Sequence, residues 1–186
     1  MNRLQSVFRI TIVHEDHDTG MLATEVLNRL AARLDTELGQ NEYPWLIDSN
    51  AFEFRLLRDP DQWEQAAAGA VEADLIIISA GGARELPECV CNWIKHVLVR
   101  KQGVPAALVV LLDSGQAGHV ERSQSGSYLR QLAERCRVDF FTSLDGQPPR
   151  AESAIEAVLS GFEDDAGLVE ATASRDSEWR GWGIND

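Results

Sequence analysis

The sequence has fewer basic than acidic residues, and it has no long apolar run. It contains 17 Lys and Arg against 30 Asp and Glu in 186 residues, a formal net charge of −13. Nucleic acids and anionic membrane surfaces are bound through clustered Lys and Arg, so this balance argues against both as partners. No apolar run approaches the ~20 residues that a membrane-spanning helix requires. We therefore expect a soluble protein, or one whose partner is basic.

Cysteine is also scarce. Three cysteines are an odd number, which excludes a complete disulfide framework. Cys89 and Cys91 stand two residues apart in a predicted helix and so point to opposite sides, which argues against a shared metal or disulfide. Residues 1–6 carry no secretory pattern and lead directly into a strand. We expect free thiols and a cytoplasmic location.

Several well-known catalytic and nucleotide-binding motifs are missing. The chain has no G-x-G-x-x-G and no Walker-type run, which would place backbone amides around a phosphate. It also has no G-x-S-x-G, the turn that presents the nucleophile of an α/β-hydrolase. The sequence therefore gives no direct indication of a dinucleotide-binding protein, a P-loop NTPase or a hydrolase.

Strand-like and helix-like runs alternate along the chain. Strands are predicted at 8–13, 52–57, 75–78, 107–112 and 138–142, and an irregular connection at 40–50. Helices are predicted at about 19–38, 59–71, 90–98, 129–136 and 151–162. Each has an apolar stripe of helical spacing. Continuously apolar third and fourth strands indicate positions covered on both faces.

This alternation predicts an α/β fold. The expected architecture is a three-layer, doubly wound, five-stranded parallel sheet in the order 2-1-3-4-5, of flavodoxin-like or receiver-like type. Residues 1–162 would form this domain, and residues 163–186 an acidic C-terminal tail. In such a sheet, ligands bind beyond the carboxyl ends of strands one and three.

Candidate ligand-binding residues follow from that rule, because they stand at the ends of the first and third strands. They are His14, Ser79, Gly81 and Gly82.

The loop after the first strand is acidic. Glu15, Asp16 and Asp18 offer the carboxylates that hard cations prefer, so they are candidate ligands of Mg²⁺. His14 or His17 could join them around a softer metal. The alternative is that these side chains cap the first helix and contact water, with Asp18 as the N-cap. The charge also argues against a phosphate in this loop unless a cation intervenes.

The ends of three strands resemble those of two-component receiver domains, over about residues 8–162. An acidic pair follows the first strand, residues 74–79 resemble the receiver's third strand, and residues 139–143 resemble the segment that carries its lysine. Ser79 stands where the phosphoacceptor aspartate belongs, and Ser143 stands where the lysine belongs. The resemblance thereby adds Ser143 to the candidate ligand-binding residues. The resemblance implies a degenerate receiver that works by binding and is not phosphorylated on an aspartate.

A second resemblance concerns the third strand and the helix after it. Residues 73–79 and 86–94 are similar to those of NADPH-dependent FMN reductases. The loop between them, 80–85, lacks the aromatic residue and the asparagine with which that family contacts the flavin. The first loop lacks the family's phosphate site, so FMN is a weaker expectation than Mg²⁺.

The tail ends in apolar side chains. Residues 163–186 contain seven acids and two arginines, but Trp179, Trp182 and Ile184 lie close together near the end. A fully solvated tail gains nothing from such side chains. We expect them to dock on the parent domain or on a second copy in a homodimer, with a separate protein partner as the alternative.

Two functions remain open. The first is a non-catalytic regulatory or protein-interaction module with a degenerate receiver-like fold. The second is a flavodoxin-fold enzyme, or a flavin- or nucleotide-binding protein, that uses the pocket beyond strands one and three.

Overall fold

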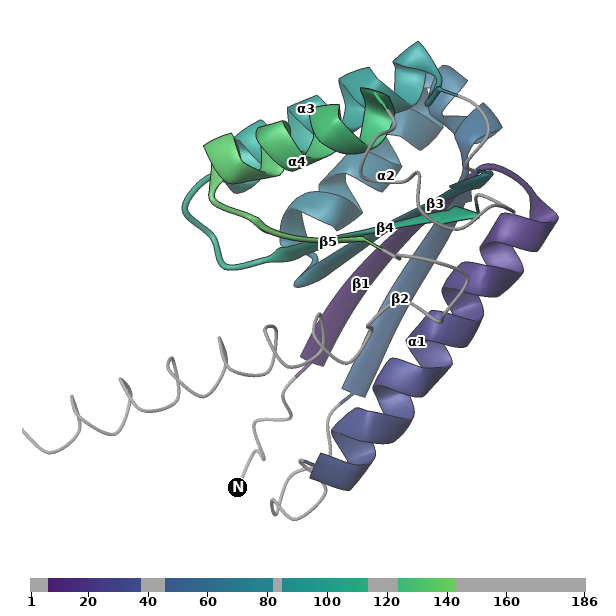
Figure 1. Cartoon of the computed structure of the whole chain (residues 1–186), viewed down its shortest axis with the longest axis vertical. Helices are drawn as coiled ribbons and strands as arrows, with labels where there is room; N and C mark the ends of the chain where they lie inside the picture. The colour runs from purple at the N-terminus through teal and green to yellow at the C-terminus, as the bar shows by residue number, and fades with distance from the viewer. Residues whose placement is uncertain (1–6, 38–45, 82–84, 114–123, 143–186) are drawn as a thin grey trace, which may run out of the picture.

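Strands and helices alternate throughout the computed structural model of the chain, which describes residues 7–37, 46–81, 85–113 and 124–142 (Figure 1). The strands are β1 (Val7–His14), β2 (Leu46–Glu53), β3 (Leu75–Gly81), β4 (Ala107–Asp113) and β5 (Asp139–Thr142). The helices are α1 (His17–Glu37), the 3₁₀ helix η1 (Phe54–Arg58), α2 (Pro60–Glu72), α3 (Glu88–Lys101) and α4 (Gln124–Cys136).

The five strands form one parallel sheet in the order β2-β1-β3-β4-β5. The predicted fold class is confirmed: this is the flavodoxin-like arrangement, with the order reversing between β1 and β3. β3 lies at the centre and is buried from Leu75 to Ala80, as its continuous apolar run predicts.

Helices cover both faces of the sheet (Figure 1). α1 lies on one face, and α2, α3 and α4 lie side by side on the other. Each face has its own core. The core beneath α1 includes Phe8, Ile10, Ile12, Val26 and Ile77, and the core on the opposite face includes Val13, Ile76, Ile78, Trp93 and Leu129.

The stripe predicted on α3 is confirmed. All five of its apolar positions are buried: Val90, Trp93, Ile94, Val97 and Leu98. A helix is amphipathic in this way when one side packs against a sheet. α2 begins as predicted, because Asp59 accepts hydrogen bonds from the N–H groups of Asp61 and Gln62 at 3.0 Å, with Pro60 in the first turn.

The second strand was predicted in the wrong place. β2 covers Leu46–Glu53, and the predicted strand 52–57 is the end of β2 followed by η1. Phe54 and Leu57 in η1 are buried, which gave this segment its strand-like apolar pattern. β2 itself is mostly exposed, so backbone pairing with β1, and not an apolar face, holds it in the sheet.

β3 also continues further than predicted. Ser79, Ala80 and Gly81 pair with β4 as strand residues, where the sequence suggested a loop. The predicted helix at 151–162 and the tail at 163–186 lie outside the described residues. No helix in the described part of the chain is long and apolar enough to cross a membrane.

Candidate functional site

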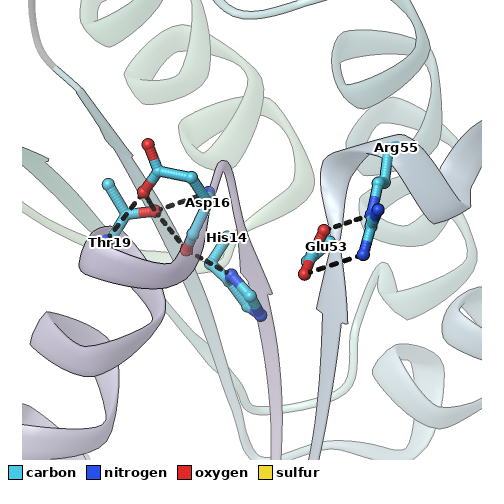
Figure 2. A network of polar contacts seen from close by, with 5 residues as sticks. All are labelled: His14, Asp16, Thr19, Glu53 and Arg55. Carbon is cyan, nitrogen blue, oxygen red and sulfur yellow. Dashed lines mark hydrogen bonds and ion pairs between the residues drawn. The ribbon is translucent and has the colours of Figure 1, made fainter.

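Asp16 and Thr19 join the end of β1 to the first turn of α1 (Figure 2). The Thr19 N–H donates to Asp16 Oδ1 at 3.0 Å, and the Asp16 N–H donates to Thr19 Oγ1 at 2.9 Å. This reciprocal pair is a capping-box arrangement, which satisfies two amides at a helix start. Asp16 is therefore the N-cap of α1, and the expectation that Asp18 caps it is wrong. Asp18 lies in the first turn instead.

The same hydrogen bonds act on the charge of Asp16. The N–H and then the hydroxyl of Thr19 lower the pKa of Asp16 from its ordinary value of 3.8. Donors that favour the charged form stabilise the carboxylate. The side chain thus serves as a helix cap and remains ionised at neutral pH.

Ser79, in β3, has its hydroxyl fully engaged inside the protein. The residue is 0% exposed, and its Oγ donates to the carbonyl oxygen of Thr19 at 2.8 Å. This bond ties the central strand to the first turn of α1. A buried and bonded hydroxyl cannot contact a ligand in this conformation.

Glu15 closes the same edge of the sheet. Its N–H donates to the carbonyl oxygen of Ser79 at 2.9 Å, and the Gly81 N–H donates to its Oε2 at 2.8 Å. The ends of β1 and β3 are the ligand-binding edge of this fold class. Here a backbone hydrogen bond and the Glu15 carboxylate join the end of β1 to the end of β3.

The imidazole ring of His14 lies beside the first turn of α1 (Figure 2). Its Nδ1 lies 2.8 Å from the carbonyl oxygen of Asp16. A carbonyl oxygen only accepts, so Nδ1 carries a proton and Nε2 is the nitrogen left for another partner. Gly20 makes room for the ring, because a Cβ at position 20 would lie 2.9 Å from Nδ1.

Glu53 is the partner of His14 in the register of β1 and β2. Both oxygens of its carboxylate are bound by Arg55, as Figure 2 shows: the Arg55 Nη2 donates to Oε1 at 3.3 Å, and Nε pairs with Oε2. The Arg55 side chain is 75% exposed, so this two-bond pair contributes modestly to stability.

An open groove of about 750 Å³ lies between α1 and β2. Ile12 and Ala51 from the sheet and Met21 and Leu22 from α1 supply apolar surface. The remaining lining residues are mostly polar: His14, His17, Asp18, Gly20, Thr24, Glu25, Asn28 and Glu53. The groove thus combines apolar surface with three carboxylates, and none of the described residues that line it is Lys or Arg.

Of the three predicted ligand-binding residues that the structure describes, His14 lines this groove, and Ser79 and Gly81 are not among its lining residues. Ser79 and Gly81 lie at the end of β3 and are used in internal hydrogen bonds. Gly82 and Ser143 lie outside the described residues, as do the tail residues Trp179, Trp182 and Ile184.

The predicted metal ligands are all described, and they do not converge. Glu15 and Asp16 each accept a backbone hydrogen bond, and Asp18 lies in the groove lining. Across residues 7–37, 46–81, 85–113 and 124–142, no group of three or more His, Cys, Asp and Glu could hold a metal ion. The arrangement gives no support to the Mg²⁺ expectation.

Three residues of the site were not expected from the sequence: Thr19, Glu53 and Arg55. The D-x-x-T spacing of residues 16–19 is a readable signal for the capping box. Glu53 and Arg55 gave no such signal, because the register that brings Glu53 beside His14 depends on where β2 begins.

Comparison with known proteins adds only a distant structural likeness. No family model and no curated protein sequence matches the chain. The crystal structure of an azoreductase from Bacillus anthracis str. Sterne is similar, with a TM-score of 0.39 and 11% sequence identity, over 87% of this chain and 98% of that one. At that TM-score the likeness carries no argument about function, and the fold assignment rests on the strand order.

Proposed function

We propose that this chain is a non-catalytic regulatory or protein-interaction module built on a degenerate receiver-like domain. The observation that carries the proposal is that polar groups at the carboxyl ends of β1 and β3 bind one another. Ser79 donates a hydrogen bond to Thr19, and Gly81 donates one to Glu15.

Phosphotransfer needs an exposed acceptor beside a metal and a cation. The position that corresponds to the acceptor holds Ser79, whose side chain is 0% exposed and already donates a hydrogen bond. The neighbouring acidic pair is also in use, because Asp16 caps α1 and Glu15 holds the Gly81 amide. These groups stabilise the fold and are not free for chemistry on a phosphoryl group.

Two assays on the full chain test the proposal. The first incubates it with Mg²⁺ and acetyl phosphate and measures the intact mass, with a receiver domain that keeps its aspartate as the positive control. The second titrates the chain into FMN and follows flavin fluorescence. We expect no phosphoryl adduct and no saturable change in fluorescence. A stoichiometric adduct, or saturable FMN binding, would overturn the proposal in favour of an active receiver or a flavin-binding protein.

A further inference from the structure

β2 has an outer edge to which no other strand is paired in the described part of the chain. It is the terminal strand of the sheet, and its described ladder runs only to β1. The N–H and C=O groups along such an edge can pair with an added strand. The exposed residues of β2 are Leu46, Asp48, Ser49, Asn50 and Ala51.

Three features that often prevent pairing are absent from β2. Protected edge strands carry Lys or Pro, or are interrupted by a bulge. The β2 sequence, LIDSNAFE, has neither residue. Its register with β1 is unbroken from the pair Val7 and Leu46 to the pair His14 and Glu53, so there is no bulge. The strand is eight residues long, and alternate residues along it present their N–H and C=O groups at the outer edge.

The groove beside this edge indicates what an added strand would carry. Alternate residues of β2 face α1, and two of them, Ala51 and Glu53, line the groove. Across from them α1 presents Asp18, Glu25 and Met21, whose side chain is 60% exposed. Lys and Arg side chains suit this combination, because their stems cover apolar surface while their charged ends reach carboxylates.

The carboxylates of the groove differ in their partners. Glu25 pairs with Arg29 four residues further along α1, and Glu53 pairs with Arg55. Asp18 has no ion pair among the described residues. Asp18 is therefore the carboxylate most open to a cation from outside, and the two exposed pairs are weak enough to exchange partners.

We infer that the outer edge of β2, with the groove between β2 and α1, binds an extended basic segment of a partner protein as an added strand. This inference rests on the proposed function and names the partner's chemistry. A second copy of the chain fits less well, because it would bring another Asp48 and a net charge of −13. The chain's own residues 163–186, with seven acids and two arginines, are also mismatched in charge.

A model peptide can test the edge. The probe is a fluorescently labelled hexapeptide of alternating Lys and Thr, which favours strand formation and places its charges on one face. The matched control alternates Lys and Pro, so it has the same charge, but each Pro lacks the N–H group of a ladder residue and is disfavoured in a paired strand. Anisotropy is measured with the full chain, and hydrogen exchange of β2 is compared with and without peptide. We expect the Lys-Thr peptide alone to bind and to slow exchange in residues 46–53.

Two variants of the chain test the groove. Ala51→Lys places a bulky positive charge on the exposed surface of β2, and we expect it to weaken Lys-Thr binding by about tenfold or more through repulsion and blocking. Ala68→Lys is the matched control: it makes the same change at an exposed position of α2, on the opposite face of the sheet. This control should bind within about twofold of the wild type.

Other outcomes would overturn the inference. Equal binding of the Lys-Pro peptide, or equal weakening by both variants, would indicate charge attraction without strand addition. Absence of binding would leave the edge without the proposed occupant. If the protein forms dimers in solution that Ala51→Lys dissociates, the occupant is a second copy of the chain. If the peptide binds more tightly after deletion of residues 163–186, the occupant is the chain's own tail. None of these results would be evidence for phosphotransfer or FMN binding. The inference about β2 can therefore fail while the proposed function still holds.

Discussion

Ser79 connects the central strand to the first helix through one hydroxyl. Its Oγ lies 2.8 Å from the carbonyl oxygen of Thr19, and the side chain is fully buried. Ser79→Ala removes this bond and leaves the rest of β3 unchanged. We expect the free energy of unfolding to fall by about 1 kcal/mol, measured by urea denaturation.

The matched control for that substitution is Ser49→Ala. Ser49 is exposed on β2, so its loss should leave the midpoint of denaturation unchanged. A Ser79→Ala protein as stable as the wild type would show that the hydroxyl is dispensable for joining β3 to α1.

Asp16 makes the stability of the protein depend on pH. Hydrogen bonds from Thr19 lower the pKa of Asp16 in the folded state. The folded state therefore binds this proton less readily than the unfolded state. The stabilisation is present above the ordinary carboxyl value of 3.8 and is lost as the pH falls through the lower folded value.

Asp16→Asn tests this dependence, because Asn also caps a helix but does not titrate there. The free energy of unfolding, measured from neutral pH down to the acid limit of folding, should fall less steeply with acid in Asp16→Asn than in the wild type. Asp18→Asn is the control, since this change keeps the backbone N–H of residue 18 and alters only its side chain, which makes none of the capping bonds to Asp16 or Thr19. If both variants follow the wild-type curve, Asp16 does not contribute to acid sensitivity.

At the scale of elements, Lys101 of α3 completes the C-terminal end of α2. Its ammonium group donates to the carbonyl oxygens of Val71, at 2.9 Å, and of Ala73. The residue is 0% exposed, and burial lowers the pKa of its ammonium group. Helix ends leave carbonyls without partners inside the helix, and here a neighbouring helix supplies the donor.

Lys101→Met keeps the apolar stem and removes the donor. We expect a loss of about 2 kcal/mol in the free energy of unfolding, because two carbonyls near the end of α2 lose a buried partner. Lys95→Met, at an exposed position of the same helix, should change stability little. Equal stability of Lys101→Met and the wild type would mean that water replaces the ammonium group at no cost.

At the scale of the whole molecule, the sequence of residues 163–186 is acidic and includes three large apolar side chains, which we expect to dock on the domain or on a second copy. Docking of Trp179, Trp182 and Ile184 predicts that deleting residues 175–186 lowers the melting temperature or changes the mass in solution. The full-length double variant Trp179→Ser, Trp182→Ser should have the same effect without shortening the chain. If the deletion alters neither property, the docking prediction fails.

The order of the sheet and the placement of four strands could be predicted from the sequence. β3 and β4 are apolar runs, β1 and β5 are short segments with β-branched or aromatic residues, and the stripe on α3 repeats at helical spacing. Such signals are local, because burial of one face or both faces of an element is recorded in the residues of that element.

β2 and the candidate site could not be predicted in the same way. β2 is a polar, exposed strand whose place depends on backbone pairing with β1, so its residues carry no pattern that fixes its start. Two apolar residues, Phe54 and Leu57, gave the incorrect strand prediction. They are buried, but they belong to the 3₁₀ helix η1 and not to a strand.

The sequence by itself determined the fold class of this protein and the residues that come to the edge between β1 and β3. Only the tertiary structure decided what those residues do. The bonds from Ser79 to Thr19 and from Gly81 to Glu15 join positions 60 and 66 residues apart. Whether a polar side chain at such an edge faces a ligand or another part of the chain depends on distances between segments, which local patterns do not contain. Here the polar groups at the ends of β1 and β3 bind one another, and the groove lies between β2 and α1.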